Sequence, residues 1–183
     1  YADVVDLLVV GNEVLLRGEQ TPEALAALLA RARRESSVPI AYADVWAFWL
    51  RYADVLRDHV DVVAIHVLPY WEDEPVSVAQ AVEHVVAVNA QMRAFFAPLP
   101  VFVGETGWPA AGRQRGPAVP GRPGQRRFVR EFVSLHARAP LGSQALPGPG
   151  IHLTAGFAQP RKTRLGGALG GSLGLVKARH FFT

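Results

Sequence analysis

The chain has 183 residues, of which half are hydrophobic and 19% are charged, a composition typical of soluble globular proteins with a buried core. It contains no cysteine, which excludes disulfides, a thiol nucleophile and cysteine-ligated metals. No apolar run reaches the roughly 18 residues that a membrane-spanning helix needs. The chain begins with Tyr and no leader follows, so we expect it to be a piece of a longer protein whose targeting signal cannot be read.

Charge is distributed unevenly along the chain. Residues 1–105 hold 15 acidic and 7 basic side chains, whereas residues 106–183 hold 12 basic side chains and a single acid, Glu131. A basic segment often indicates binding to nucleic acid. This one is broken by Gly and Pro and contains few aromatic residues after Phe132, so we expect no nucleic-acid partner.

Apolar runs and helical patterns alternate from the start of the chain. Strands are predicted at residues 4–10, 39–43, 60–67, 101–104 and, more weakly, 151–155. The runs are almost continuously Val, Ile and Leu, as expected for a parallel sheet that is covered on both faces.

Helices are predicted between these strands. Thr21 caps the first, with Pro22 at its first position. The segment 46–57 is predicted to be helical, with Trp46 and Trp49 as packing residues. Ser77 and Gln80 form the capping box of a long helix that ends before Pro98. The last helix is indicated by the spacing of Phe128, Phe132 and Leu135.

Such alternation is compatible with a doubly wound sheet or with a (β/α)8 TIM barrel. The apolar runs end on polar residues: Asn12 and Glu13, Asp44, His66 and Glu105. The carboxyl ends of barrel strands converge on one mouth, where catalytic residues lie. A doubly wound sheet would more often show a Gly-rich phosphate turn after its first strand, and none occurs here. We therefore predict an α/β TIM barrel.

Five units are too few to close a barrel, and the chain is shorter than the roughly 250 residues typical of the fold. We predict that residues 1–183 form one partial barrel domain that contains about strands four to eight and lacks the earlier ones.

Glu13 and Glu105 are the candidate catalytic residues. Cleavage of a glycoside with retention needs one protonated carboxyl group and one ionised carboxylate, about 5 Å apart. Two strand-end Glu residues in one barrel satisfy this requirement, and the Asn12 amide is suited to bind a neighbouring sugar hydroxyl. The alternative is that each Glu is a solvated residue at a helix entrance.

The remaining candidates also have structural alternatives. His66 either contacts substrate or is a core histidine bonded to a backbone carbonyl, and Asp44 could simply cap its helix. Tyr70, Trp71 and Trp108 lie just beyond strand ends, where aromatic faces could stack on sugar rings, although barrel aromatics usually pack in the core.

Three segments carry a specific resemblance: VVGNEVLLRGE at 9–19, AIHVLPYWEDEPV at 64–76 and VFVGETGWP at 101–109. They resemble glycoside hydrolase family 17, in particular its bacterial β-1,3-glucan hydrolase and glucosyltransferase branch, and the likeness extends over residues 1 to about 138. The resemblance implies a (β/α)8 barrel. It also implies that Glu13 is the acid/base and Glu105 the nucleophile, with further glucan contacts at Asn12, Tyr42, His66, Tyr70 and Trp108.

The same resemblance implies no metal and no organic cofactor, because the two carboxylates perform the chemistry. It favours an extracytoplasmic location, periplasmic or membrane-attached, because some bacterial relatives carry membrane anchors or are joined to a membrane glucan synthase. A fused or neighbouring synthase is therefore a possible partner of the full-length protein.

After residue 138 the likeness weakens. GFAQPRK at 156–162 and RLGGALGGSLGL at 164–175 resemble a segment in which relatives read close to EAFDQPWK and RLEGTVGGYWGL. Acidic and aromatic residues are lost selectively. We interpret residues 139–183 as a divergent segment, decayed or misread. The loss of the acidic and aromatic residues from it should weaken binding of the sugar.

From the sequence we expect a retaining hydrolase or transglycosylase that acts on β-1,3-glucan by double displacement, with the choice between endo and exo action left open. Two alternatives remain at this point. One is a β-1,4-glucan or mannan hydrolase of a related barrel family. The other is an inactive remnant that binds glycans.

Overall fold

The computed structural model describes residues 5–138 and 151–153. The described strands are β1 (Leu8–Asn12), β2 (Ile40–Val45), β3 (Val62–His66), β4 (Val101–Thr106) and β5 (Ile151–Leu153). The helices are α1 (Pro22–Glu35), α2 (Trp46–Arg51), α3 (Ala53–Leu56), the 3₁₀ helix η1 (Arg57–His59), α4 (Ala81–Phe96) and α5 (Arg122–Arg138).

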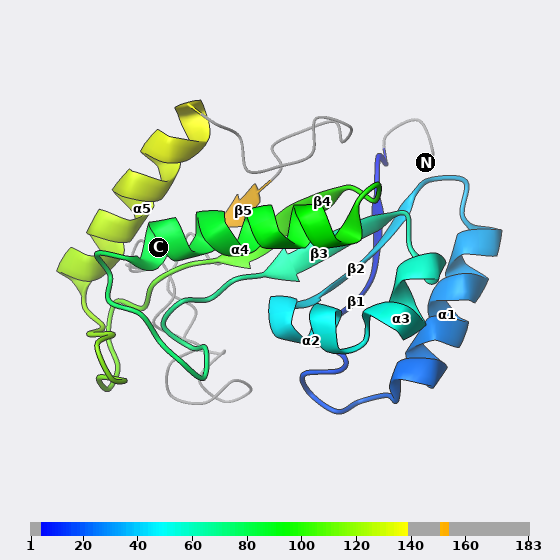
Figure 1. Cartoon of the computed structure of the whole chain (residues 1–183), viewed down its shortest axis with the longest axis horizontal. Helices are drawn as coiled ribbons and strands as arrows, with labels where there is room; N and C mark the ends of the chain where they lie inside the picture. The colour runs from blue at the N-terminus through cyan, green and yellow to red at the C-terminus, as the bar shows by residue number, and fades with distance from the viewer. Residues whose placement is uncertain (1–4, 139–150, 154–183) are drawn as a thin grey trace, which may run out of the picture. The chain divides into compact units, whose positions relative to one another are not determined.

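The five strands form one sheet in the order β1-β2-β3-β4-β5 (Figure 1). Strand β1 pairs in parallel with β2, and β2 pairs in parallel with β3. Sequential order in a parallel sheet, with a helix after each of the first four strands, is the arrangement that βα units produce. The predicted α/β fold with a parallel sheet is therefore confirmed.

The chain groups into two compact units. The first comprises residues 1–67, 88–104 and 141–151, and the second comprises residues 68–87, 105–140 and 152–183. The boundary passes through α4 and through β4, so that Gly104 belongs to the first unit and Glu105 to the second. A single domain over residues 1–183 stays a prediction.

In the first unit, the two faces of the sheet differ in side-chain size. One face carries a cluster in which Phe102 packs against four small residues, Ala41, Ala43, Val62 and Ala64. The alternating residues of β2 lie on the opposite face, where the Tyr42 ring contacts Trp49 of α2 at a centroid distance of 5.5 Å. Figure 1 shows α1, α2 and α3 grouped beside strands β1 to β3.

Helix α1 begins as the sequence predicts. The Thr21 hydroxyl accepts a hydrogen bond from the Ala24 amide at 3.2 Å, and Pro22 occupies the first turn. The buried side chains Leu25, Ala26 and Leu29 fall on one face of the helix. This apolar stripe is the side that packs against the rest of the unit.

The predicted helix at 46–57 is interrupted. Helix α2 ends at Arg51, Tyr52 adopts φ −117° and ψ 20°, and α3 then covers only Ala53–Leu56 before η1. Asp44 does not cap α2, because the N-cap residue is Val45 and it has no side-chain cap hydrogen bond. The predicted packing role of Trp49 is confirmed: its side chain is fully buried, and its indole N–H donates to the Ala64 carbonyl at 2.9 Å.

The predicted capping box before α4 is wrong. The helix begins at Ala81, whereas Ser77–Gln80 forms a hydrogen-bonded turn with Gln80 N donating to Ser77 O at 3.0 Å. The Ser77 hydroxyl is within 2.8 Å of the Gln80 side-chain oxygen and so caps no helical amide. Among the described helices, none combines the length and the hydrophobicity needed to cross a membrane.

The second unit is organised around stacked aromatic rings. Phe128 and Phe132 of α5 stack at 5.6 Å, and Trp108 stacks on Phe128 at 6.4 Å. The Gln125 side chain donates to the Trp108 carbonyl at 3.1 Å. All four side chains are buried, which confirms that Phe128 and Phe132 form the inward face of the last predicted helix.

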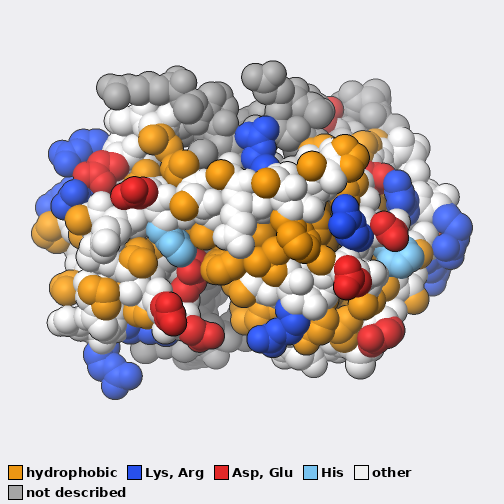
Figure 2. All heavy atoms as spheres, in the orientation of Figure 1, with side chains coloured by type: hydrophobic (Ala, Val, Ile, Leu, Met, Phe, Trp, Pro, Cys, Tyr) orange, Lys and Arg blue, Asp and Glu red, His pale blue; other side chains and the backbone are white. Residues whose placement is uncertain are grey.

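The surface carries charges of both signs. Figure 2 shows acidic and basic side chains interspersed over the face that it draws. Pairs such as Arg31 with Glu35 at 2.9 Å are exposed, so each contributes little to stability. The Pro/Gly-rich connection 139–150 and the divergent segment from residue 154 onward lie outside the described residues.

Candidate active site

Glu13 directly follows β1 in an unusual backbone conformation. Its φ of 53° is the only positive value at a described residue other than glycine. The strand is irregular just before it, since the register with β2 shifts between Val9 and Asn12. A left-handed residue with a long side chain costs about 1–3 kcal/mol and persists only where its surroundings impose it. Such strain is found most often at functional sites.

Strand β2 supplies the groups that impose this conformation. The Glu13 amide donates to the Ala43 carbonyl at 2.8 Å. The Leu15 amide lies 3.1 Å from the Tyr42 hydroxyl oxygen and 3.2 Å from Asp44 Oδ2, and the Tyr42 hydroxyl itself donates to Asp44 Oδ2. The turn that follows Glu13 is therefore bonded to buried side chains of the neighbouring strand.

Burial shapes the acid–base behaviour of this support. It is the main reason that the pKa of the Tyr42 hydroxyl lies well above its ordinary value, and the hydrogen bond to Asp44 adds to the effect. Burial also raises the pKa of Asp44, against the opposing effect of hydrogen bonds from Tyr42 and from backbone amides. Both side chains are fully buried. Tyr42 therefore stays protonated and donates its hydrogen bond throughout the neutral range.

The Glu13 side chain contacts a buried histidine. Glu13 Oε1 lies 2.9 Å from His66 Nδ1 at the end of β3. His66 is 1% exposed and the Glu13 side chain 21% exposed. Arg17 Nη1 lies 3.8 Å from the other carboxylate oxygen. One carboxylate oxygen is thus oriented by an imidazole, while the side chain as a whole keeps a solvent-facing surface.

Glu105 is located through its own strand. It is the fifth residue of β4 and is half-buried. The preceding residue, Gly104, lies against the His66 ring, since a Cβ on Gly104 would be 3.4 Å from His66 Cδ2. Such a Cβ would be in ordinary van der Waals contact with the imidazole that contacts Glu13. The ends of β3 and β4 therefore lie close together at this point.

Comparison with known proteins gives these strand ends a chemical context. The family description "BtgE/BtgC glycoside hydrolase domain" matches residues 1–145. The chain belongs to this family. The predicted resemblance to a glycoside hydrolase is thereby confirmed, and the two strand-end Glu residues both lie inside the matched region.

Two fungal relatives of this glycoside hydrolase domain are named for related activities. A glucan 1,3-beta-glucosidase of Schizosaccharomyces pombe is 30% identical over 132 residues, which are 63% of this chain and 40% of the relative. A probable beta-glucosidase btgE of Aspergillus terreus is 26% identical over 135 residues, or 71% of this chain and 24% of the relative. The chain thus spans less than half the length of either.

Solved structures share the fold of the domain. A glycoside hydrolase family 17 β-1,3-glucanosyltransferase from Rhizomucor miehei superposes with a TM-score of 0.77 at 22% identity, covering 95% of this chain and 60% of that one. An endo-laminarinase from Formosa gives a TM-score of 0.65 at 17% identity, covering 96% and 55%. These likenesses show the fold that the resemblance to family 17 predicted, whereas membership of the bacterial branch stays a prediction.

The other predicted glucan contacts differ in accessibility. Asn12 is exposed at the end of β1 and Trp71 is half-buried in the loop after β3. Tyr42, Tyr70 and Trp108 are fully buried. Contact with glucan stays a prediction for all of them, and for the three buried rings it would require a movement that exposes them.

The structure also reveals residues that sequence reasoning missed. Arg17 lies beside Glu13, and its only sequence signal was the spacing of four residues between opposite charges. Arg115 contacts the loop that carries Trp71, and Glu72 of the same loop pairs with His84 at 2.8 Å. These contacts join loops that are far apart in the sequence, so no local sequence pattern predicts them.

Proposed function

We propose that this glycoside hydrolase domain cleaves or transfers β-1,3-glucan by retaining double displacement, with Glu13 as acid/base and Glu105 as nucleophile. The observation that carries the proposal is the Glu13 side chain, held by a buried histidine on a strained backbone at a strand end. Strain and buried support of this kind are expected where a side chain must be aimed. Membership of the family supports the choice of glycoside chemistry.

In the first step, a Glu105 carboxylate oxygen attacks the anomeric carbon of the bound sugar. The bond to the departing oxygen breaks, and Glu13 gives that oxygen its proton. The products are a covalent glycosyl-enzyme and a released sugar chain. The role requires Glu13 to be protonated and Glu105 ionised when substrate binds.

In the second step, Glu13, now ionised, removes a proton from an incoming hydroxyl group. That oxygen attacks the anomeric carbon and the bond to Glu105 breaks, which restores the starting configuration. Water as the acceptor gives hydrolysis, whereas a sugar hydroxyl gives transfer. Both outcomes use the same two carboxylates and differ only in the occupant of the acceptor position.

The names of the relatives support β-1,3-glucan as the substrate class. One relative is called a glucan 1,3-beta-glucosidase, and an active-site mutant of the Rhizomucor miehei β-1,3-glucanosyltransferase was solved in complex with laminaritriose. Contacts of Asn12 and Trp71 with the sugar are part of the proposal, whereas the buried His66 acts through its contact with Glu13. A fused or neighbouring membrane glucan synthase stays a prediction without support from these relatives.

Incubation with two oligosaccharide series tests the proposal. The full-length protein that carries this domain is mixed with laminari-oligosaccharides or cello-oligosaccharides, and the products are followed by mass. We expect shorter products from hydrolysis, longer ones from transfer, and a preference for the laminari series. The Glu105→Gly variant should lose turnover, and Glu83→Gln, which changes an exposed residue on α4, is the matched control.

Two results would contradict the proposed function and favour an alternative. Faster turnover of cello-oligosaccharides or manno-oligosaccharides would favour a β-1,4-glucan or mannan hydrolase. Binding of laminari-oligosaccharides without any change in mass would mark the protein as an inactive glycan-binding remnant.

A further inference from the structure

The loop after β3 carries Trp71 and is clamped by one arginine. Arg115 donates from Nη1 to the Tyr70 carbonyl at 3.0 Å and from Nη2 to the Glu72 carbonyl at 3.2 Å. These two carbonyls flank Trp71 in the sequence. A planar guanidinium can satisfy two acceptors with fixed geometry, which a flexible ammonium group cannot do. The backbone on both sides of Trp71 is therefore bonded to one side chain.

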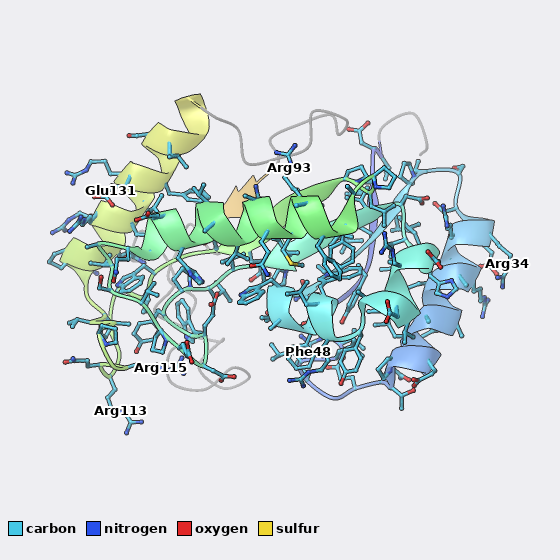
Figure 3. All side chains as sticks on the ribbon, viewed as in Figure 1. Arg34, Phe48, Arg93, Arg113, Arg115 and Glu131 are labelled. Atoms are coloured by element: carbon cyan, nitrogen blue, oxygen red, sulfur yellow. The ribbon has the colours of Figure 1, made fainter. Side chains whose placement is uncertain are left out.

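Further contacts make this clamp rigid. The Arg115 guanidinium lies 5.9 Å from the centroid of the Tyr70 ring, close enough for a cation–π interaction. The Tyr70 hydroxyl donates to the Arg113 carbonyl, which joins the same two loops from the opposite direction. Figure 3 shows the labelled Arg113 extending outward from the segment between β4 and α5.

Arg115 is itself held in place by its own turn. Its amide and carbonyl exchange hydrogen bonds with Ala118 at 3.0 and 2.9 Å. Gly116, with a φ of 50°, permits the tight turn between them, and a Cβ on it would lie 3.8 Å from Pro75 Cγ. The turn 115–118 therefore lies against the end of the loop 68–76.

The aromatic residues around the clamp differ in what they can touch. Tyr70 is fully buried, and its ring packs edge-to-face against Trp71 at 4.9 Å and Trp108 at 5.8 Å. Trp71 alone among these three keeps part of its side chain accessible. The buried rings of Tyr70 and Trp108 thus support Trp71, which is the one of the three rings that a ligand can contact.

We propose that Arg115 is a positioning residue for glucan binding, which fixes the turn 70–72 so that Trp71 presents its indole face to a sugar ring. The inference rests on the proposed function and adds a specific binding device to it. Stacking on a sugar ring needs a fixed ring plane, because a mobile indole loses conformational entropy when the sugar binds.

Steady-state kinetics with laminari-oligosaccharides tests this role in the full-length protein. For Arg115→Met we expect KM to rise about tenfold, which corresponds to about 1.4 kcal/mol of binding, with kcat within about twofold of wild type. Arg115→Lys should rescue only part of the loss, because an ammonium group lacks the planar fork. The control is Arg93→Met, which removes an exposed arginine that Figure 3 shows extending outward from α4.

A double-mutant cycle separates positioning from general destabilisation. In the Trp71→Ala background, Arg115→Met should change KM by less than about twofold. If Arg115 acts only through Trp71, the effects of the two substitutions on KM are not additive. A full tenfold effect in that background, or a wild-type KM for Arg115→Met alone, would overturn the proposal. Calorimetric titration of laminari-oligosaccharide into the wild-type protein distinguishes failure of the proposed function from failure of the Arg115 role. If the wild-type protein does not bind the oligosaccharide, glucan recognition is refuted, and the role of Arg115 with it.

Discussion

Glu13 pairs a strained backbone with a side chain that is oriented by His66. The strain has a thermodynamic consequence, because only glycine adopts a left-handed conformation without steric cost. We expect Glu13→Gly to raise the free energy of unfolding by about 1 kcal/mol relative to Glu13→Ala, while both variants lose activity. Urea denaturation measures the difference. Equal stability of the two variants would show that the backbone at residue 13 is not strained.

Asp44 acts through hydrogen bonds instead of as a helix cap. It accepts from the Leu15 and Val45 amides and from the Tyr42 hydroxyl in a fully buried position. Asp44→Ala leaves these three donors without this acceptor, so we expect the free energy of unfolding to fall by about 1–3 kcal/mol. Asp54→Ala, at an exposed position on α3, is the matched control and should fall within about 0.5 kcal/mol of wild type.

The strand-end positions of Glu13, His66 and Glu105 were predictable, because apolar runs that end on ionisable residues place those side chains at strand ends. Their roles in catalysis and binding stay predictions. The left-handed conformation of Glu13 was not predictable, because that region is signalled by Gly or Asn and not by Glu. The role of Arg115 was also hidden, since its partners lie 43 and 45 residues away in the sequence.

At the scale of the element, α2 depends on one indole ring. Trp49 donates to the Ala64 carbonyl and packs edge-to-face on Phe96 at 5.5 Å. Trp49→Phe keeps most of the apolar surface and removes the donor, so we expect a loss of about 1–3 kcal/mol in the free energy of unfolding. Phe48→Leu, one residue earlier and half-buried, should have a much smaller effect. Similar losses for the two variants would argue against the importance of the indole hydrogen bond.

The start of α4 and the loop 68–76 are joined by a pH-dependent contact. The hydrogen bond that His84 Nε2 donates to the Glu72 carboxylate raises the pKa of His84 above its ordinary value of 6.5. Because the pKa of His84 is higher in the folded than in the unfolded protein, the contact with Glu72 stabilises the fold fully at pH values below the unfolded pKa. This stabilisation is lost as the pH rises through the folded pKa. His84→Gln should therefore destabilise at about pH 5.5 and have little effect at about pH 9.

Thermal unfolding of wild type and His84→Gln across this range measures the effect. The difference between the two curves should shrink as pH rises. A constant difference would mean that His84 contributes by packing alone. His59→Gln, in η1, is the matched control for replacing a histidine by glutamine.

Element boundaries show where prediction from the sequence was weaker. The Thr21 cap was predicted correctly because a single side chain satisfies a nearby amide. The Ser77–Gln80 box failed because those four residues close a turn of their own before α4 begins. At the break at Tyr52 the packing partners change, since α2 packs against β2 and β3 whereas α3 packs against α1. Hydrophobic spacing does not encode such a change.

At the scale of the whole molecule, alternation of strands and helices correctly predicted the parallel α/β sheet, and strand-end polarity favoured a barrel over a doubly wound fold. Likeness to family 17 structures confirms that fold. The extent of the domain was less predictable, because residues 139–183 follow neither the family pattern nor a clear periodicity.

Rescue by azide assigns the roles of those carboxylates. With an activated aryl β-glucoside as substrate, the leaving group departs without help from an acid. In Glu105→Gly, azide replaces the missing nucleophile and attacks in a single inverting step. In Glu13→Ala, the glycosyl-enzyme still forms, and azide then displaces Glu105 in a second inversion.

The decisive measurement is the anomeric configuration of the glycosyl azide, read from the coupling constant of its anomeric proton by NMR. The proposed double displacement predicts an α-linked azide from Glu105→Gly and a β-linked azide from Glu13→Ala. The reverse assignment, or wild-type activity in either variant without azide, would contradict the proposed double displacement at Glu13 and Glu105.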